Sequence, residues 1–497
     1  MKIVEDLVKV IQNYVIELKL DSDKKQIKSL SNNSRKVRPN YVFVAIKGFT
    51  SDGHQFIEQA IEAGANTIIY SQDLKKYHDE INYIKVTDTV AAYNEAVAWF
   101  FDYPAEKLKV IGVTGTNGKT TTAFIIELIL NSLNNRCGLI STVKHSSILT
   151  QIAAERTTPE AFFLQQLFAQ MVEDECHNVV MEVSSHALEQ KRVGNTKFAV
   201  GIFSNLSGDH LDYHHSMENY YNAKKTMFIN HISDEGIIII NHDCEYGQKL
   251  LKELVIEKKS TQKLISYGFN PNADFVLSNF SSDENGSSFY LKLPEIDEKL
   301  AIEDNLIGEY NALNLTAAII AVNSYGYEFD EIIKIIAEEN FVIPGRLERF
   351  QLDNGATVFI DYAHSDDALK NVLMVLRKIC VNKLSVIFGC GGDRDKTKRP
   401  RMGKIANQYA DKVFLTTDNP RSENPSDIIN DIKEGIDTDC DLYEIENREA
   451  AIQAALNQAE TGDIVLIAGK GHETYQIIGD EKIFFDDSKV VKKFIDA

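Results

Sequence analysis

The segment that most constrains the fold is residues 111–122, which read Ile-Gly-Val-Thr-Gly-Thr-Asn-Gly-Lys-Thr-Thr-Thr. Residues 109–113 are predicted as a buried strand and residues 120–133 as a helix with an apolar face, so a glycine-containing turn joins them. Glycines let consecutive backbone N–H groups point at anionic oxygens, and the positive end of the helix dipole favours the same charge. The segment therefore predicts a phosphate-binding loop in an α/β domain.

The side chains of this loop fit a nucleoside triphosphate. Lys119 is placed to contact the outer phosphates, and the Thr120 hydroxyl is placed to bind Mg²⁺. Position 113 is valine where the common form of the loop has glycine, so the loop is a variant. An ordinary strand-to-helix turn rich in glycine and threonine is the alternative interpretation. The flanking strand and helix patterns favour phosphate binding.

The length and charge of the chain limit the classes of protein that it can represent. Its 497 residues predict about three domains, each large enough for a core of its own. The chain has 53 Lys and Arg residues against 73 Asp and Glu residues, which gives a net charge of -20. This charge disfavours nucleic acid and anionic membranes as partners, so we expect small anionic ligands held in local pockets.

Cysteine usage and hydropathy predict a cytoplasmic protein without a membrane anchor. The cysteines show neither Cys-x-x-Cys spacing nor a His-x-Cys pairing, so we expect neither a zinc site nor a disulfide framework. Residues 1–20 mix acidic and apolar side chains as an amphipathic helix does, in contrast to a signal sequence. The longest aliphatic run, residues 237–240, is too short to cross a bilayer.

The pattern of the whole chain predicts an α/β fold of three domains. Residues 1–105 form a small mixed α/β domain, with an edge-like strand at 41–46, another strand at 66–70 and a linker at 101–104. Residues 106–341 form a central domain with a mostly parallel sheet around the phosphate loop. Residues 342–497 form a C-terminal, Rossmann-like α/β domain. Other strands are expected at 178–183, 198–202, 236–240, 357–360, 384–388, 412–416 and 463–467.

Acidic and histidine side chains in the central domain predict a metal site. Glu182 follows a buried strand, so its carboxylate can hold Mg²⁺ together with the Thr120 hydroxyl. A solvated glutamate at a strand end is the alternative. Residues 207–215 are rich in ligand-type side chains, and a second Mg²⁺ with His210 as one ligand is favoured over zinc. His214 and His215 are expected at the surface.

Six segments occur in the order in which they are found in one enzyme family. They are residues 115–121, 182–186, 209–214, 344–346, 361–364 and 469–473. On these segments essentially the whole chain resembles the Mur ligases, the ATP-dependent amide-forming enzymes of peptidoglycan precursor synthesis. Within that family, residues 33–35, 52–54 and 389–395 resemble the members that form the tripeptide.

The resemblance implies a reaction in two steps. The D-Glu carboxylate of UDP-N-acetylmuramoyl-L-Ala-D-Glu attacks the γ-phosphate of ATP, which gives ADP and an acyl phosphate. An incoming amine then attacks the acyl carbon and expels phosphate. Lys119 and two Mg²⁺ ions would screen the repulsion between the two anions.

The resemblance also assigns roles to single residues. The implied catalytic residues are Lys119, His210 and Lys224, and Lys224 is implied to be carbamylated by CO₂, which turns an ammonium into a metal-binding carboxylate. Spacing alone does not separate Lys224 from Lys225. The implied metal ligands are Thr120, Glu182, His210 and Lys224. The residues implied to bind ATP are Gly115, Thr116, Asn117, Gly118, Lys119, Thr120, Thr121, Asn311, Arg346, Asp361 and His364.

Two further sets follow from the resemblance. The residues implied to bind the UDP-sugar dipeptide are Ser34, Thr157, Thr158, Ser184, Gln190 and Arg192. The residues implied to bind meso-2,6-diaminopimelate are Arg394, Asp418, Asn419, Pro420, Arg421, Gly469 and Glu473.

The choice of diaminopimelate depends on the segment 418–425. The Asp-Asn-Pro-Arg of residues 418–421 resembles the diaminopimelate-adding members, whereas lysine-adding members generally lack the arginine. Arg421 can form a bidentate pair with the second carboxylate of diaminopimelate, and Glu473 can receive its amine. Bound lysine would leave Arg421 unpaired. Ligation of L-lysine remains the alternative.

Two other functions are possible alternatives. A folylpolyglutamate synthetase-like ligase has a similar phosphate loop, but the segments 33–35 and 52–54 of the first domain argue against it. A nucleotide-hydrolysing switch protein would not need the amino-acid pocket of the third domain. The basic run at 396–401 is expected to be a solvated loop rather than a nucleic-acid site. We expect a monomer.

Overall fold

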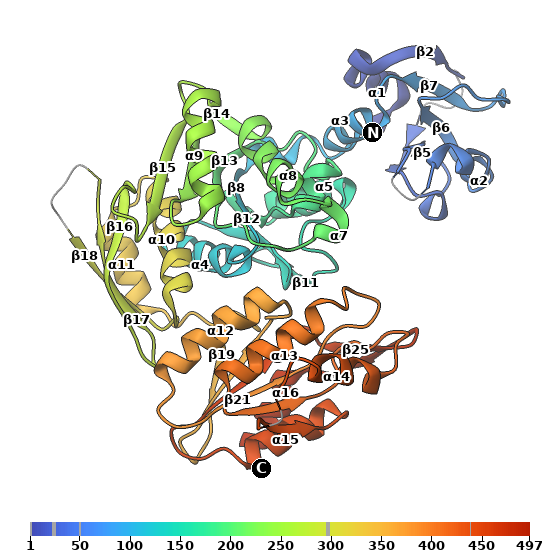
Figure 1. Ribbon diagram of the computed structural model, residues 1–497. Helices are drawn as coiled ribbons and strands as arrows, with labels where there is room; N and C mark the ends of the chain where they lie inside the picture. Colours follow the sequence, from blue (N-terminus) through green and yellow to red (C-terminus); the bar gives the residue numbers. More distant parts are fainter. Residues whose placement is uncertain (1, 22–25, 49–50, 295–298, 438) are drawn as a thin grey trace.

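The computed structural model describes residues 2–21, 26–48, 51–294, 299–437 and 439–497. Three main sheets follow one another along the chain, with five strands in the N-terminal part, eleven in the central part and six in the C-terminal part. In Figure 1 the N-terminal part lies to one side of the central part, and the C-terminal part lies below it. This architecture confirms the predicted three-domain α/β fold, whereas the exact domain limits stay a prediction.

The N-terminal sheet has the strand order β2-β7-β6-β5-β4, in which only the β2–β7 pair is antiparallel. Its strands are β2 (Val15–Lys19), β4 (Ser29–Ser31), β5 (Tyr41–Val44), β6 (Ala65–Tyr70) and β7 (Asn82–Val86). A short pair, β1 (Lys2–Ile3) with β3 (Gln26–Ile27), and the helix α2 (Ile57–Glu62) accompany it.

Two predictions for this domain were wrong. The segment 41–46 is not an edge strand, because β5 pairs with β4 on one side and β6 on the other, and residues Val42, Phe43 and Val44 are fully buried. Residues 2–20 do not form one helix. The apolar side chains of α1 (Val4–Val10) pack inward, and the chain then extends into β2, where pairing with β7 outweighs the helical pattern.

One helix connects the N-terminal domain to the rest of the molecule. Helix α3 (Thr89–Phe100) starts at Asp88, whose side chain accepts hydrogen bonds from the backbone of Val90 and Ala91, and it packs against α5 (Ala161–Glu173). Asn94 in α3 donates to the carbonyl of Lys191 at 2.9 Å.

The central sheet is mostly parallel, as predicted. Its order is β11-β10-β9-β12-β8-β13-β14-β15-β16-β17-β18, and the strands from β9 to β16 are parallel. Those strands are β9 (Cys137–Ile140), β12 (Asn178–Glu182), β8 (Lys109–Thr114), β13 (Phe198–Phe203), β14 (Ile232–Asn241), β15 (Lys263–Gly268) and β16 (Phe275–Ser282). Antiparallel strands extend both ends: β10 (Lys144–Ser146), β11 (Gln151–Ala153), β17 (Ser287–Lys292) and β18 (Lys299–Asp304).

Helices cover both faces of this sheet, so its central strands are buried on both sides. Ile111 of β8 belongs to the core shared with α4 (Lys119–Ser132) and α10 (Glu309–Asn323), whereas Val110 belongs to the core shared with α5 and α8 (Met217–Asn230). A β-carbon at Gly112 would lie 2.4 Å from Met227 of α8, so glycine allows α8 to approach the sheet closely. The remaining helices are α6 (Ser185–Glu189), α7 (Leu211–His214), α9 (Glu245–Glu257) and α11 (Phe329–Glu338).

The C-terminal sheet has the order β19-β20-β24-β21-β22-β23, and all its pairs except β19–β20 are parallel. Its strands are β19 (Glu348–Gln351), β20 (Thr357–Asp361), β24 (Ile464–Ala468), β21 (Leu384–Phe388), β22 (Lys412–Leu415) and β23 (Asp441–Glu444). Helices α12 (Asp366–Ile379), α13 (Lys398–Tyr409) and α14 (Pro425–Lys433) cover one face, and α15 (Arg448–Asn457) and α16 (Asp487–Ile495) cover the other. A hairpin of β25 (Tyr475–Ile478) and β26 (Glu481–Phe484) forms a separate two-stranded sheet, and Ile478 of β25 makes a backbone bridge to Arg421.

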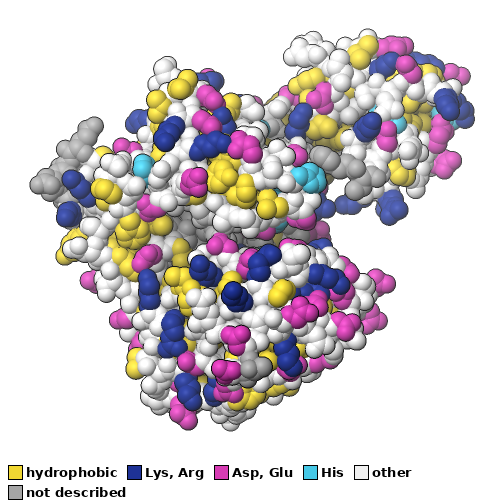
Figure 2. Space-filling model, in the orientation of Figure 1, with side chains coloured by type: hydrophobic (Ala, Val, Ile, Leu, Met, Phe, Trp, Pro, Cys, Tyr) yellow, Lys and Arg dark blue, Asp and Glu magenta, His cyan; other side chains and the backbone are white. Residues whose placement is uncertain are grey.

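The surface is acidic overall, and its charges are mixed. On the face shown in Figure 2, Lys and Arg side chains alternate with Asp and Glu side chains. Within the described residues, no helix has both the length and the apolar character needed to cross a bilayer.

Candidate active site

The glycine turn of residues 115–118 brings the end of β8 to the start of α4. Gly118 precedes α4 with a φ of 86°, and a β-carbon there would lie 2.3 Å from the Asn314 side-chain oxygen. Only glycine fits this combination of conformation and close approach. The Lys119 ammonium donates to the carbonyls of Gly115 at 3.0 Å and Thr116 at 2.7 Å, so it folds back over the turn. The local geometry is that of a phosphate-binding loop.

A cavity of about 510 Å³ opens in front of this loop, between the central and C-terminal domains. Its volume suits a small-molecule ligand. The structure brings most of the predicted ATP-binding residues together here. Those that line the cavity are Thr116, Asn117, Gly118, Lys119, Thr120, Thr121, Asn311, Arg346, Asp361 and His364, joined by Thr157, Glu182 and His210. Gly115 contributes its carbonyl just behind them.

Glu182 ends β12 beside the loop and is fully buried. Its carboxylate accepts hydrogen bonds from the hydroxyl of Thr120 at 2.9 Å and from the backbone and hydroxyl of Thr142 at 2.8 and 3.1 Å. The Arg346 guanidinium donates to the Thr120 hydroxyl at 3.2 Å from the C-terminal side. A buried carboxylate beside a hydroxyl is a donor set of hard oxygens, which fits Mg²⁺.

The predicted metal ligands, which all lie in the described part of the chain, do not form a cluster of acidic, histidine or cysteine side chains. Within the described ranges, no three His, Cys, Asp or Glu side chains gather as they would at a metal site built from these residues alone. The predicted set therefore depends on the Thr120 hydroxyl and on modification of Lys224.

Lys224 lies inside the protein, next to the phosphate loop. The residue is 1% exposed, and its Nζ donates to the Gly115 carbonyl at 2.8 Å and lies 4.7 Å from the centre of the Tyr220 ring. Burial, with the neighbouring Lys119 charge, moves the pKa of Lys224 well below its ordinary value. A buried lysine with a lowered pKa loses its proton more readily than an exposed one, and the neutral amine is the form that reacts with CO₂.

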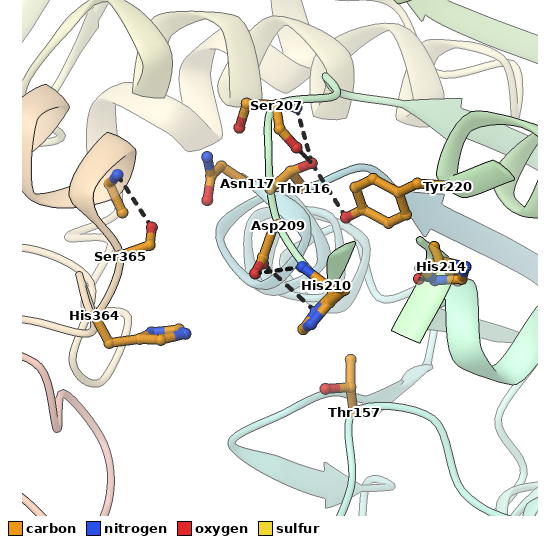
Figure 3. Close-up of polar contacts among 12 residues, drawn as sticks. Thr116, Asn117, Thr157, Ser207, Asp209, His210, His214, Tyr220, His364 and Ser365 are labelled. Atoms are coloured by element: carbon orange, nitrogen blue, oxygen red, sulfur yellow. Dashed lines mark hydrogen bonds and ion pairs between the residues drawn. The ribbon is translucent and has the colours of Figure 1, made fainter. Parts of the chain in front are cut away.

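His210 points into the same cavity from the segment after β13. Figure 3 shows Asp209 and His210 on the central domain, with His364 of the C-terminal domain opposite. His210 adopts a left-handed backbone conformation with a φ of 55°. Burial lowers its pKa to about 4, so the imidazole is neutral at pH 7 and has a free lone pair for a metal.

His214 is buried, which corrects the expectation that it lies at the surface. It is 3% exposed, and its Nε2 lies 2.9 Å from the Ser185 hydroxyl while its Nδ1 lies 3.0 Å from Glu189. Its ring stacks on Tyr220, whose hydroxyl lies 3.2 Å from that of Thr116 (Figure 3). His214 therefore supports the phosphate loop from behind. No pattern in the sequence distinguishes His214 from an exposed histidine.

The predicted dipeptide-binding residues fall into two places. Thr158 and Ser184 meet at the end of β12, where the Ser184 backbone donates to the Thr158 hydroxyl at 3.0 Å. Arg192 donates to the Gln190 side chain at 3.0 Å and to the Thr158 carbonyl at 3.3 Å, so these residues share one cluster. Ser34 does not join them, because it is buried in the N-terminal domain and donates to the side chain of Gln59.

The predicted amino-acid pocket forms where β21, β22 and β24 end. Asn419 donates to the Glu473 carboxylate at 2.9 Å, and the fully buried Lys470 lies 3.1 Å from the same oxygen. Arg421 has a φ of 52° and donates to the Gly392 carbonyl at 2.7 Å. Of the remaining predicted residues, Asp418, Pro420 and Gly469 lie at this strand edge and are buried, and Arg394 is exposed on the neighbouring loop.

A second cavity of about 960 Å³ adjoins the first, and Glu473 is the residue of the predicted amino-acid pocket that lines it. Glu473 and His472 line it on the C-terminal side, and Thr142 and Thr157 line it on the central side. Thr142, Thr157 and Tyr362 line both cavities, so the amino-acid pocket and the phosphate loop open into adjoining spaces.

Comparisons with known proteins decide the family. Three family models match in chain order: the Mur ligase family catalytic domain over residues 26–102, the Mur ligase middle domain over 113–322, and the Mur ligase glutamate ligase domain over 345–471. A Clostridium perfringens protein named UDP-N-acetylmuramoyl-L-alanyl-D-glutamate--2,6-diaminopimelate ligase is 41% identical over 497 residues, which cover 100% of both chains. The chain belongs to the Mur ligase family.

Other Mur ligases agree with this assignment. A relative of the same name from Nostoc sp. is 43% identical over 468 residues, which cover 93% of this chain and 92% of the relative. A solved structure titled as a UDP-N-acetylmuramoyl-L-alanyl-D-glutamate--2,6-diaminopimelate ligase is 32% identical, with a TM-score of 0.70 and coverage of 97% of each chain. The fold of this Mur ligase is thus shared along essentially its whole length.

Two residues of this Mur ligase site were missed by sequence reasoning besides His214. Thr142 holds the Glu182 carboxylate, but it follows β9 in a stretch without any motif. Lys470 lies in the segment 469–473, which carries part of the family resemblance. A lysine that directly follows an apolar strand and stands between two glycines could have indicated a buried functional side chain. Thr142 contacts a residue in a distant strand, so its role required the fold, whereas Lys470 contacts Glu473 within the same segment.

Proposed function

We propose that this chain is an ATP-dependent ligase that joins meso-2,6-diaminopimelate to the D-Glu carboxylate of UDP-N-acetylmuramoyl-L-Ala-D-Glu. The observation that carries the proposal is the adjacency of the two cavities. A phosphate loop with Lys119 faces one of them, a pocket with Glu473 faces the other, and both share Thr142 and Thr157. A ligase needs this arrangement, because phosphate donor, acyl group and amine must meet. The names of the full-length relatives support the same activity.

The first step would take place in front of the phosphate loop. The D-Glu carboxylate attacks the γ-phosphorus of ATP, the bond to the β-phosphate oxygen breaks, and ADP leaves from an acyl phosphate. Lys119 and Arg346 line the cavity here, and they would stabilise the charge that gathers on the transferred group. Bound Mg²⁺ would neutralise further charge, held by the Thr120 hydroxyl and the Glu182 carboxylate, with His210 and Lys224 as ligands of a second ion.

The second step would take place where the cavities adjoin. The neutral amine of diaminopimelate attacks the acyl carbon, phosphate leaves with the bonding electrons, and the nitrogen gives up a proton to the departing phosphate. Glu473 is held by Asn419 and Lys470 through one oxygen, which leaves its other oxygen available for an amine of the substrate. The burial of these groups lowers the local polarity and strengthens each charged contact.

Specificity for diaminopimelate would depend on Arg421. Its guanidinium is tied through one nitrogen to the Gly392 carbonyl, and its remaining donors match the second carboxylate of diaminopimelate. L-lysine has no group at that position, and an arginine without its partner costs about 1.5–3 kcal/mol for each charged hydrogen bond lost. We therefore expect diaminopimelate to be preferred over lysine by about tenfold or more.

The test is phosphate release by the full chain with ATP, Mg²⁺ and UDP-N-acetylmuramoyl-L-Ala-D-Glu. Release should require diaminopimelate, and mass spectrometry should find the tripeptide product. Equal turnover with lysine would make the protein a lysine ligase. Release without any amino acid would favour a hydrolysing switch protein, and activity only with a folate and glutamate would favour a folylpolyglutamate synthetase.

We further propose that the protein acts in the cytoplasm on small-molecule substrates, with no nucleic acid and no membrane as partner. The net charge of -20 supports this, because it repels polyanionic surfaces. A monomer remains our expectation.

A further inference from the structure

The basic run at residues 396–401 is exposed at Lys396 and Arg401, as expected for a solvated segment, but Arg399 within it is buried. Helix α13 begins at Lys398, and the Arg399 side chain is fully buried in its first turn. Lys398 donates to the carbonyl of His364 at 2.7 Å. A buried guanidinium is stable only with well-placed partners, so the partners of Arg399 indicate its purpose.

Arg399 forms a two-pronged ion pair with Glu423. Its two terminal nitrogens donate to the two carboxylate oxygens of Glu423 at 3.0 and 2.9 Å, and one of them also donates to Asp431 at 2.7 Å. Lys396 lies 2.9 Å from the same glutamate. The hydrogen bonds from Arg399 and Lys396 lower the pKa of Glu423 to about 2, so this carboxylate is ionised at neutral pH.

Glu423 in turn joins two loops at the predicted amino-acid pocket. It lies two residues after Arg421 in the loop 418–423, and it also accepts a hydrogen bond from the backbone of Asp393 at 2.6 Å in the loop 389–395. A β-carbon at Gly392 would lie 1.9 Å from the Pro420 carbonyl, so the two loops touch backbone to backbone.

Both loops contain a residue in the left-handed backbone region. Arg421 and Asp393 have φ values of 52° and 53°, a conformation that aspartate adopts readily but that is uncommon for arginine. The Ser422 hydroxyl donates to the Asp393 carboxylate at 2.7 Å and ties the loops together on their outer side. The Arg399–Glu423 pair and the hydrogen bond from Asp393 to Glu423 connect the same two loops on their inner side.

We propose that Arg399 is a positioning residue for substrate selection. Through its paired hydrogen bonds to Glu423, it holds the loops 389–395 and 418–423 so that Arg421 faces the second carboxylate of diaminopimelate. The inference rests on the proposed function, because it assigns Arg421 to that substrate. Arg399 itself lies behind the pocket and does not touch the substrate.

The test compares two substitutions that meet at Arg399. Glu423→Gln removes the charge that joins Arg399 to the pocket loops, and Asp431→Asn removes the partner of Arg399 on helix α14. We expect Glu423→Gln to raise the KM for diaminopimelate about tenfold or more, with the KM for ATP changed by less than about twofold. The preference for diaminopimelate over lysine should fall in parallel. Asp431→Asn should leave these values close to the wild type.

The substitution Arg399→Lys tests the contact between Arg399 and Glu423 from the other side. Lysine keeps the charge but loses the two-pronged geometry, so the KM for diaminopimelate should again rise while the KM for ATP stays. A loss of folded protein in any variant lowers kcat and leaves KM unchanged, so the KM values report on positioning.

Two results would overturn the inference. If Glu423→Gln and Asp431→Asn raise the KM for diaminopimelate equally, or if the KM for ATP rises with it, Arg399 serves general packing. If neither Glu423→Gln nor Arg399→Lys changes the KM for diaminopimelate, the contact has no role in selection. A wild-type protein that does not use diaminopimelate would instead refute the proposed function, and this inference with it.

Discussion

Single side chains near the phosphate loop have environments that fit the chemistry assigned to them. Lys224 is the clearest case, because its amine is buried beside Lys119 and next to the Gly115 carbonyl. Its neighbour Lys225 points to the surface instead, where it pairs with Glu253 at 2.9 Å and Glu257 at 3.0 Å. The structure therefore offers a physical reason to choose between two lysines that the sequence alone left equivalent.

This difference leads to a prediction for paired variants. Lys224→Met has a similar shape and suits a buried site, but it offers no amine for CO₂, so we expect turnover to fall about a hundredfold or more. Lys225→Met should keep turnover within about twofold, because the half-buried Lys225 pairs with Glu253 and Glu257 of helix α9 and not with the phosphate loop. The measurement is phosphate release at saturating substrates, with melting temperatures as a check on folding. Normal turnover in Lys224→Met would remove this residue from the chemistry.

Sequence reasoning located single residues well where a local motif carried them. Lys119, Thr120 and Glu182 were expected to meet, and they line one cavity. Arg399 was misjudged because a basic run in an acidic chain is usually exposed, and only the position of Glu423 across the loop explains its burial.

At the scale of the elements, the strand–turn–helix unit of β8 and α4 determines where the phosphates would bind. Gly118→Ala should disturb this unit in two ways. The φ of 86° is unfavourable for alanine, and the new methyl group would lie 2.3 Å from the Asn314 oxygen. We expect the free energy of unfolding to fall by about 1–3 kcal/mol in denaturant titrations and ATP binding to be lost in calorimetry.

Gly326→Ala is the matched control. Gly326 has a similar φ of 92°, but a β-carbon there has no neighbour within 4 Å. We expect it to lose only about 1–2 kcal/mol of stability, from backbone strain, and to bind ATP normally. Retained ATP binding in Gly118→Ala would show that the loop does not hold the phosphates as proposed.

Most inner strands of the central and C-terminal sheets were predicted, since strands such as β12 and β21 are apolar runs buried on both faces. The parallel strands β9, β15, β16 and β23 were not predicted. The short additions at the sheet ends were not predicted either. Strands β10 and β11 are three residues each, and β11 is exposed throughout, so their sequences carry no apolar pattern. The internal position of β5 was also missed, because neighbours in a sheet depend on topology.

For the whole molecule, the important contact is the one between the central and C-terminal domains. Arg346 bridges them, since it donates to Thr120 at 3.2 Å and its guanidinium lies 4.6 Å from the centre of the Tyr362 ring. Arg346→Gln should raise the KM for ATP about tenfold or more, because a charged hydrogen bond is lost. The KM for diaminopimelate should change little in steady-state assays.

Arg349→Gln is the control for this contact. Arg349 lies at the surface of β19 and donates to the side chains of Asn285 and Gln351 at 3.2 Å, away from the loop. Its substitution should leave both KM values near the wild type. If both substitutions raise the KM for ATP equally, Arg346 contributes only its positive charge and not a specific contact.

The central proposal is that a carboxylate is activated by phosphate transfer before the amide forms, and oxygen labelling tests it most directly. The substrate would carry ¹⁸O in both oxygens of its D-Glu side-chain carboxylate, and the products would be separated and weighed by mass spectrometry. We expect one labelled oxygen in each phosphate released and the other in the new amide. Unlabelled phosphate alongside a fully labelled substrate would mean that water attacks ATP, which would contradict the proposed ligase.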